Sequence, residues 1–151
     1  MYRSTLIYVE QDGRYLMLHR VKKQGDINRD KWIGVGGKFE PGETALDCAK
    51  REMAEETGLI AEKLDYRGIV YFESDLYESE EMHLFTCRAF SGTLHECDEG
   101  TLEWVDKRKI YSLNLWEGDR LFLEKLAADA PFFRLRLRYE GDTLAESAFL
   151  Q

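Results

Sequence analysis

The stretch Gly37-Lys-Phe-Glu-Pro-Gly-Glu43, followed after seven residues by Arg51-Glu-Met-Ala-Glu-Glu-Thr-Gly-Leu59, decides how this chain folds. Pro41-Gly42 is a turn dipeptide, and Thr44 with Asp47 three residues later forms a capping-box pattern. A helix is therefore predicted to begin at about Thr44. Gly58 readily adopts the left-handed conformation at which helices often end. The stretch predicts a loop, a helix and a stop.

The helical period places carboxylates beside the buried side of this helix. At about 100° of rotation per residue, an apolar stripe that we expect to be buried contains Leu46, Ala49 and Met53. An adjoining arc of about 100° carries three acids, Glu52, Glu55 and Glu56. Most acidic helix faces are simply solvated, so this pattern alone does not predict a site.

Two features favour a binding face over a solvated one. Ala45 and Cys48 are small and lie on the same arc, so a ligand can approach it closely. Like charges three or four residues apart also repel by about 0.2–0.5 kcal/mol per pair, which Arg51 offsets only in part. A hard divalent cation held by carboxylate oxygens would remove this conflict.

At these positions the chain resembles the signature box of the Nudix (MutT-like) hydrolases. The likeness covers every fixed position and spacing of the box: Gly37, Glu43, Arg51, Glu52, Met53, Glu55, Glu56, Gly58 and Leu59. A pattern with this many fixed positions rarely arises by chance. The resemblance implies a hydrolase with a Nudix fold, an α/β/α sandwich around a central mixed β-sheet.

Length and composition limit the alternatives. A chain of 151 residues without a linker suits a single domain, 1–151, and the net charge of −8 argues against binding a nucleic acid polymer. No apolar run approaches the ~20 residues of a membrane span, and the start lacks a secretory segment, so we expect a soluble cytoplasmic protein. Three cysteines at spacings that match no zinc motif are expected to be free thiols.

The first third of the chain is expected to form a hairpin and a glycine-rich approach to the helix. Residues 5–9 and 15–20 are β-rich and flank Asp12-Gly13, a strong turn signal. Residues 21–31 are polar and predict an exposed loop. Glycines at 34, 36 and 37 indicate backbone that turns sharply or approaches a ligand.

The remainder predicts more strands and a second helix. Strands are expected at 63–73, 82–90 and 101–105, and the acidic segment 74–81 is either a flap near the site or, as we favour, a solvated hairpin loop. From Trp116 the period becomes helical until the residues before Pro131. Residues 132–150 predict a hairpin with one covered face, an extension of the domain whose edge could pair with another chain.

In Nudix enzymes the glutamates of the box bind Mg²⁺, for which Mn²⁺ can substitute, and this role maps to Glu52, Glu55 and Glu56. The resemblance further implies a carbonyl ligand from Gly36, with Gly37 and Lys38 beside the phosphates. Arg51 is expected to orient the carboxylates, with Glu43 as its partner. A further ligand or base is expected beyond the box, where Glu99 is favoured and Asp98 and Glu96 compete. Which of Glu52, Glu56 and Glu99 accepts the proton from water stays open.

More of the chain, about 3–140, resembles the 8-oxo-dGTP diphosphatases, through residues 31–44, 99–105 and 116–119. That likeness assigns Trp116 to stacking on the oxidised purine and Asp119 to reading its edge, although a core tryptophan and a helix-start acid are the simpler explanations. Thr5 and Arg20 match pocket positions, with Arg20 in place of a lysine. Ile33 stands where the mammalian members carry a purine-reading asparagine.

The sequence thus predicts Mg²⁺-dependent hydrolysis of a nucleoside triphosphate to a nucleoside monophosphate and pyrophosphate, with 8-oxo-dGTP as the leading substrate. Hydrolysis of another nucleoside diphosphate-linked compound, such as a dinucleoside polyphosphate or a nucleotide sugar, is the alternative on the same fold. A non-catalytic nucleotide sensor is a third reading, which the intact box disfavours. Either a monomer or a homodimer is compatible with the sequence.

Overall fold

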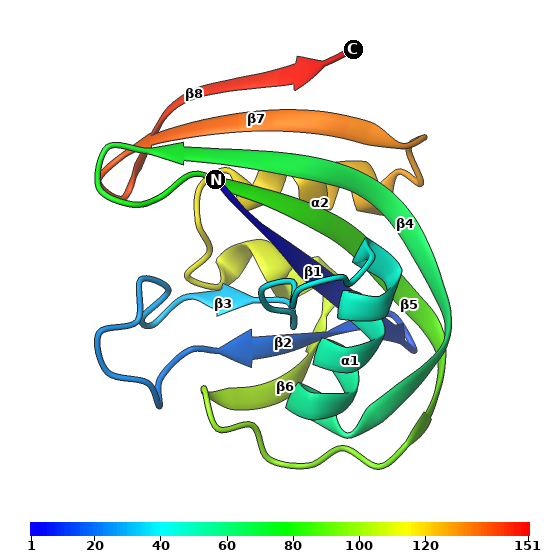
Figure 1. The fold of residues 1–151 in the computed structure, drawn as a ribbon. Helices are drawn as coiled ribbons and strands as arrows, with labels where there is room; N and C mark the ends of the chain where they lie inside the picture. The colour runs from blue at the N-terminus through cyan, green and yellow to red at the C-terminus, as the bar shows by residue number, and fades with distance from the viewer.

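The computed structural model describes all 151 residues and is built around one mixed sheet of eight strands (Figure 1). The hydrogen-bonded order is β3-β2-β1-β5-β4-β7-β8, and β6 pairs with β2. The strands are β1 (Tyr2–Gln11), β2 (Arg14–His19), β3 (Trp32–Ile33), β4 (Leu59–Ser74), β5 (Glu80–Gly92), β6 (Thr101–Asp106), β7 (Phe133–Glu140) and β8 (Thr143–Leu150). The helices are α1 (Ala45–Thr57), α2 (Asp119–Ala127) and the 3₁₀ helix η1 (Lys107–Ser112).

Helix α1 begins and ends as the sequence predicts. The Thr44 side chain accepts a hydrogen bond from the Asp47 backbone, the Asp47 carboxylate accepts one from the Thr44 backbone, and Gly58 follows the helix at φ 80°. Ala49 and Met53 are fully buried. The prediction for Leu46 is wrong, because this residue of the first helical turn is 42% exposed and its neighbour Asp47 is exposed as well.

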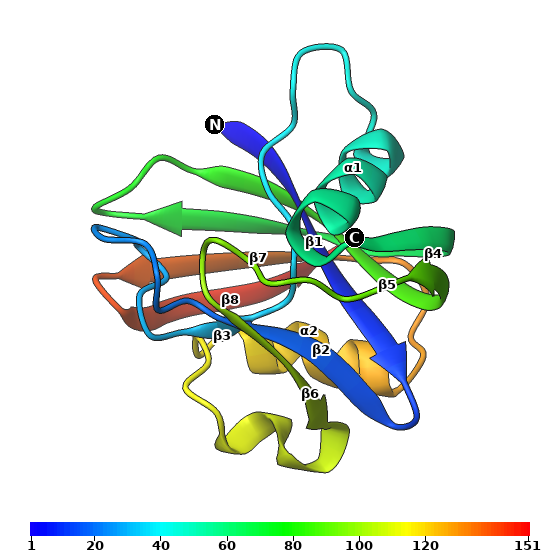
Figure 2. The same cartoon turned by 90° about the horizontal axis from the view of Figure 1, so that it is seen from below.

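The two helices cover opposite faces of the sheet, as the two views show (Figures 1 and 2). Alternate residues of β1 divide between two cores, since successive side chains of a strand point to opposite faces. Ile7 and Val9 pack with Ala49 and Met53 of α1, and Leu6 and Tyr8 pack in a second core with residues of α2, Phe122, Leu123 and Leu126. The expected α/β/α sandwich is confirmed.

The glycine-rich segment lies along the first half of β1, away from the turn of the hairpin. β1 pairs with β2 only at residues 9–11, and nearer its start it exchanges hydrogen bonds with residues 35–39 instead. A β-carbon at Gly34 would lie 2.6 Å from the Ile7 carbonyl oxygen, and one at Gly36 would lie 2.0 Å from that of Thr5. Glycine at these positions therefore lets the segment reach β1 and carry Lys38 to the sheet.

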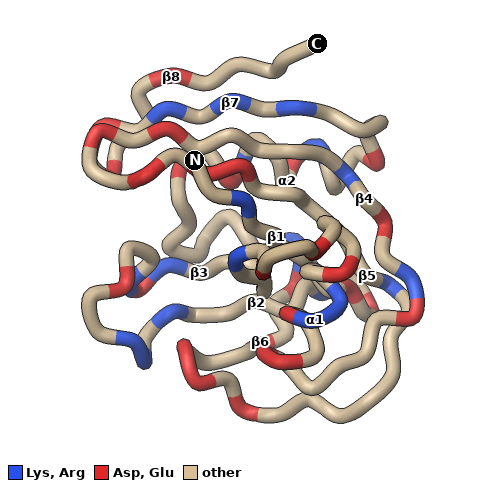
Figure 3. The backbone as a smooth tube through the Cα atoms, viewed as in Figure 1, with Lys and Arg blue, Asp and Glu red and all other residues tan.

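The second half of the chain completes the sheet. β5 runs parallel to β1, β4 pairs with β5 antiparallel, and β7 runs parallel to β4. The predicted tail hairpin is present and joins the sheet through β7, where Leu135, Leu137 and Tyr139 are buried. Figure 3 shows basic residues alternating along β7 and acidic residues in the neighbouring loop between β4 and β5; Arg136 of β7 pairs with Glu73 at 2.9 Å.

Several boundaries differ from the sequence predictions. Strands β4 and β5 are longer than expected because they pair along almost their whole length, with irregular register in β4. Helix α2 begins at Asp119 rather than Trp116, and η1 was not predicted. Neither α1 nor α2 has the length and hydropathy that a membrane-spanning helix needs.

The end of α1 supplies a test of the local backbone. Gly42 and Gly58 both have φ near 80°, but a β-carbon at Gly42 would meet nothing within 4 Å, whereas one at Gly58 would lie 2.5 Å from the Thr93 carbonyl oxygen. We expect Gly42→Ala to lower the free energy of unfolding by about 1 kcal/mol, the cost of the left-handed conformation. Gly58→Ala should cost clearly more, about 2–3 kcal/mol. Urea unfolding of both variants checks this, and equal losses would contradict the packing at Gly58.

Candidate functional site

One cavity of about 570 Å³ gathers most of the residues that the sequence singles out. Its size lies within the usual range of small-molecule sites. Eleven of the thirteen predicted site residues line it: Thr5, Arg20, Ile33, Gly36, Gly37, Lys38, Glu52, Glu56, Glu99, Trp116 and Asp119. Arg51 and Glu55 do not line it, and neither do Asp98 and Glu96, the two competitors of Glu99.

Helix α1 presents Glu52 and Glu56 to the cavity from one side. The backbone N–H of Gly36 donates a hydrogen bond to the Glu56 carboxylate at 2.8 Å. A β-carbon at Gly37 would lie 2.6 Å from the carboxyl carbon of Glu52, so a larger residue there would displace the Glu52 carboxylate from its present position. The glycine segment thus contacts both carboxylates of the helix.

Arg51 holds the acids of the box together from outside the cavity. Its guanidinium donates to the Glu43 carboxylate at 2.7 and 2.8 Å, to Glu52 at 2.7 Å and to Glu55 at 3.1 Å. It also donates to the Lys38 carbonyl oxygen at 3.1 Å. Arg51 and Glu43 are therefore paired, and the orienting role of Arg51 stays a prediction. Glu55, whose side chain is 59% exposed, lies on the rim with Arg51.

Glu99 approaches Glu56 from the turn before β6. Arg20, the residue after β2, donates to Glu99 at 2.9 Å and to Asp26 at 2.7 Å, which ties that turn to the loop after β2. Burial raises the pKa of Glu56, and a hydrogen bond with the Glu99 side chain raises it further. Burial also raises the pKa of Glu52, against the lowering effect of Arg51. Negative charge is therefore costly at Glu52 and Glu56.

The opposite part of the cavity is apolar and aromatic. Trp116 packs edge-on against Tyr139 with ring centroids 5.3 Å apart, and its indole N–H donates to the side-chain oxygen of Asn28 at 2.8 Å. Asp119 is only 3% exposed. Burial is the main cause that raises the pKa of Asp119 from 3.8 to about 8, so this carboxyl is mostly protonated at neutral pH and can donate a hydrogen bond.

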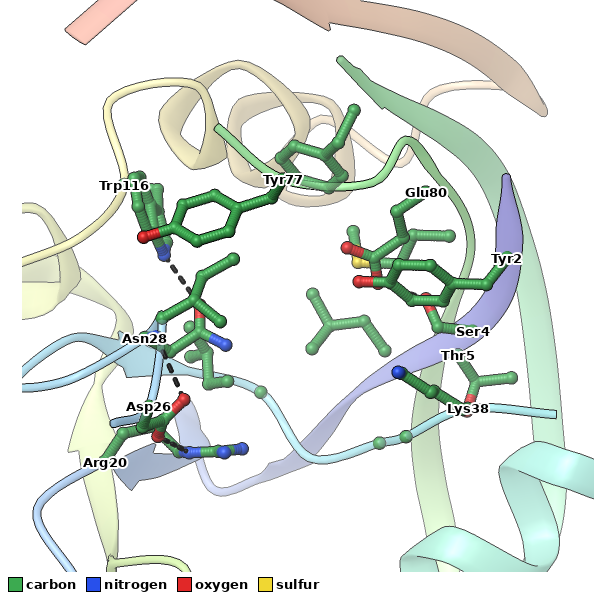
Figure 4. A pocket seen from close by; sticks show the side chains of 18 of the residues that line it. Tyr2, Ser4, Thr5, Arg20, Asp26, Asn28, Lys38, Tyr77, Glu80 and Trp116 are labelled. Carbon is green, nitrogen blue, oxygen red and sulfur yellow. Dashed lines mark hydrogen bonds and ion pairs between the residues drawn. The ribbon is translucent and has the colours of Figure 1, made fainter. Parts of the chain in front are cut away.

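Between these two parts the wall is formed by β1 and the glycine segment. Figure 4 shows Trp116 and Asn28 on one side of the cavity and Lys38, Tyr2 and Thr5 on the other. The Lys38 ammonium lies 4.6 Å from the centre of the Tyr2 ring. The Thr5 hydroxyl lies 3.5 Å from the Cys48 sulfur and is buried. Lys38 is therefore the cation that the glycine segment brings to this wall.

Sequence reasoning missed several lining residues. Tyr2, Ser4 and Glu80 meet because β1 pairs in parallel with β5, a pairing that no local pattern reveals.

Asp26 and Asn28 belong to the segment predicted as an exposed loop, yet the Asp26 side chain is only 3% exposed. In a common turn motif, an Asp side chain accepts a hydrogen bond from the backbone N–H two residues later, as Asp26 does from Asn28. An Asp in this loop was therefore the one signal that the sequence offered. Tyr77 shows that the 74–81 segment borders the cavity.

Comparison with known proteins agrees with this geometry. The family model described as NUDIX domain matches residues 2–126. A Danio rerio protein named "Oxidized purine nucleoside triphosphate hydrolase" is 38% identical over 120 residues, which cover 78% of this chain and 74% of the relative. A Mus musculus protein of the same name is 34% identical over 129 residues, covering 85% and 81%. The crystal structure of a MutT protein from Bacillus halodurans shares the fold, with a TM-score of 0.89, 24% identity and coverage of 99% and 97%.

Asp119 generates a prediction about pH and stability. Because its folded-state pKa is raised from 3.8 to about 8, the folded protein keeps a proton that the unfolded chain releases. The free energy of unfolding should therefore fall by up to about 1.4 kcal/mol per pH unit between pH 4 and 8, and this loss should stop above pH 8. Asp119→Asn removes this titration, so its stability relative to the wild type should rise across the same range.

Urea unfolding of both proteins at several pH values measures the difference. Subtracting the two curves cancels the titration of every other group, including the carboxylates around Glu56. Parallel curves between pH 4 and 8 would show that Asp119 is ionised in the folded protein and would contradict its neutral state.

Proposed function

Because this chain belongs to the Nudix hydrolase family, we propose that it hydrolyses a nucleoside triphosphate to a nucleoside monophosphate and pyrophosphate, with 8-oxo-dGTP as the leading substrate. One observation carries the proposal: a single cavity joins the carboxylates Glu52, Glu56 and Glu99 to Trp116 and Asp119. The names of the fish and mouse relatives support a purine nucleotide. The test is pyrophosphate release.

The carboxylates fit a hard divalent cation, Mg²⁺ or in its place Mn²⁺. No three of them converge on one point here, because Glu52 is drawn to Arg51 and Glu99 to Arg20. The donor set nevertheless consists of carboxylate oxygens, the ligands that Mg²⁺ prefers. Burial and the neighbouring Glu99 carboxylate raise the pKa of Glu56, and a cation bound there would relieve this cost of negative charge. Glu52, Glu56 and Glu99, with the Gly36 carbonyl and Glu55 at the rim, would hold the metal.

Side chains of the cavity would position the phosphates and the attacking water. A bound divalent cation supplies positive charge against the phosphate oxygens. Arg51 keeps Glu52 oriented through its 2.7 Å hydrogen bond, and Lys38 places a further positive charge at the wall of the cavity. Glu52, Glu56 and Glu99 are the candidates for taking a proton from the attacking water, a role that requires an ionised carboxylate.

The apolar part of the cavity would hold the base. Trp116 offers a ring for stacking, and the protonated Asp119 offers a hydrogen-bond donor to an acceptor on the purine edge. Ile33 lines this part and contributes only apolar surface. We expect the protein to act in the cytoplasm on free nucleotides rather than on a nucleic acid polymer, as a single domain in a monomer or homodimer.

Pyrophosphate release from 8-oxo-dGTP, dGTP and a panel of other nucleotides in the presence of Mg²⁺ tests the proposal. The wild type should prefer 8-oxo-dGTP. Glu56→Gln keeps the side-chain shape and an acceptor for the Gly36 N–H but removes the charge, so the rate should fall about 10²–10⁴-fold.

Glu62→Gln is the matched control, because Glu62 lies exposed on β4 outside the cavity, and it should keep the wild-type rate. Cleavage of only a dinucleoside polyphosphate or a nucleotide sugar would overturn the substrate. Binding of nucleotides without any cleavage would leave a sensor on this fold and overturn the proposed reaction.

A further inference from the structure

Asn28 presents a hydrogen-bond donor to the part of the cavity where the base would lie. It belongs to the loop between β2 and β3, and its side-chain oxygen accepts the Trp116 indole N–H at 2.8 Å. An indole N–H can only donate, so the amide oxygen must face Trp116 and the amide nitrogen must face away from it. Figure 4 shows Asn28 on the same side of the cavity as Trp116, with dashed lines to Trp116 and to Asp26.

The loop holds Asn28 in place through buried contacts. The Asn28 backbone N–H donates to the Asp26 carboxylate at 3.0 Å, and the Asn28 carbonyl oxygen accepts from the Lys31 N–H at 2.8 Å. Asp26 is in turn held by Arg20 at 2.7 Å, with both side chains nearly buried. A side chain fixed on both its backbone and its amide oxygen is preorganised, so it binds a ligand without a large loss of conformational entropy.

The residues next to Asn28 in the cavity supply few other hydrogen-bond donors to a base. Ile33 carries no polar side-chain atom, and the Trp116 N–H is already used, so the amide of Asn28 is a second donor to the base besides the protonated Asp119. The amide nitrogen of Asn28 is a donor only, so it matches a carbonyl oxygen on a base edge and opposes an exocyclic amino group. Guanine-type bases carry a carbonyl at position 6, where adenine-type bases carry an amino group.

We propose that Asn28 determines base specificity by donating its amide N–H to the carbonyl oxygen of a 6-oxopurine, and so selects 6-oxopurine over 6-aminopurine nucleotides. This inference rests on the proposed function, because it places a purine next to Trp116. The alternative is that Asn28 only positions the Trp116 ring and makes no contact with the base.

The variant Asn28→Asp separates the two roles. Aspartate keeps the size of the side chain and an acceptor for the Trp116 N–H, but it replaces the donor nitrogen with a second acceptor oxygen. The added charge affects both purine nucleotides alike, so the measured quantity is the ratio of kcat/KM for 8-oxo-dGTP to that for 8-oxo-dATP. These two compounds both carry the 8-oxo group and differ in the substituent at position 6, in the hydrogen on N1 and in the 2-amino group.

We expect the wild type to favour 8-oxo-dGTP and Asn28→Asp to lower the ratio at least about 10-fold. Asn114→Asp is the matched control: Asn114 lies outside the cavity, bonded to Lys31 and the Asp30 carbonyl, and should leave the ratio unchanged. An unchanged ratio in Asn28→Asp, or equal cleavage of both compounds by the wild type, would overturn the role of Asn28.

Calorimetric binding of 8-oxo-dGMP and 8-oxo-dAMP keeps this inference distinct from the proposed reaction. If the wild type cleaves neither triphosphate but binds 8-oxo-dGMP more tightly, and Asn28→Asp loses that preference, the proposed hydrolysis fails and the role of Asn28 stands. If the wild type binds both monophosphates equally or binds neither, the role of Asn28 is overturned.

Discussion

Repulsion among carboxylates is the constraint on which this structure depends. Glu52 and Glu56 come from one helix and Glu99 from a distant turn, and all three line one cavity. Burial raises the pKa of both Glu52 and Glu56. Such a cluster persists only because other contacts hold it: Arg51 neutralises part of the charge from behind, and Arg20 fixes Glu99 from the side. A bound cation would balance the negative charge of the carboxylates that Arg51 and Arg20 leave uncompensated.

The fold brings this acidic cluster within reach of a base pocket. β1 pairs with β2 only beside the hairpin turn, and the glycine segment bonds to the rest of that edge of β1, where Gly36 donates to Glu56. The loop after β2 then crosses to Trp116 through Asn28, and Arg20 links the same loop to Glu99. Acid groups and base wall are therefore connected by one continuous set of hydrogen bonds, so displacement of the loop would disturb both.

The sequence predicted features that depend on neighbouring residues. Thr44, Asp47 and Gly58 specify the ends of α1 because their hydrogen bonds and backbone angles are local. The family resemblance identified the acids, but not the contacts that hold them: Arg20 and Glu99 are 79 residues apart, and Trp116 and Asn28 are 88 apart. The burial of Asp26 and the exposure of Leu46 follow from where the loop and the first helical turn meet the sheet, which helical periodicity cannot specify.

The central claim is that these carboxylates form a cation site, and Mg²⁺ binding with proton release tests it most directly. Calorimetric titration at neutral pH in two buffers of different ionisation enthalpy gives both the affinity and the number of protons released. The account predicts binding at millimolar Mg²⁺ or below, with release of about one proton, because the raised pKa of Glu56 falls when a cation arrives. No binding at millimolar Mg²⁺, or binding without proton release, would contradict it.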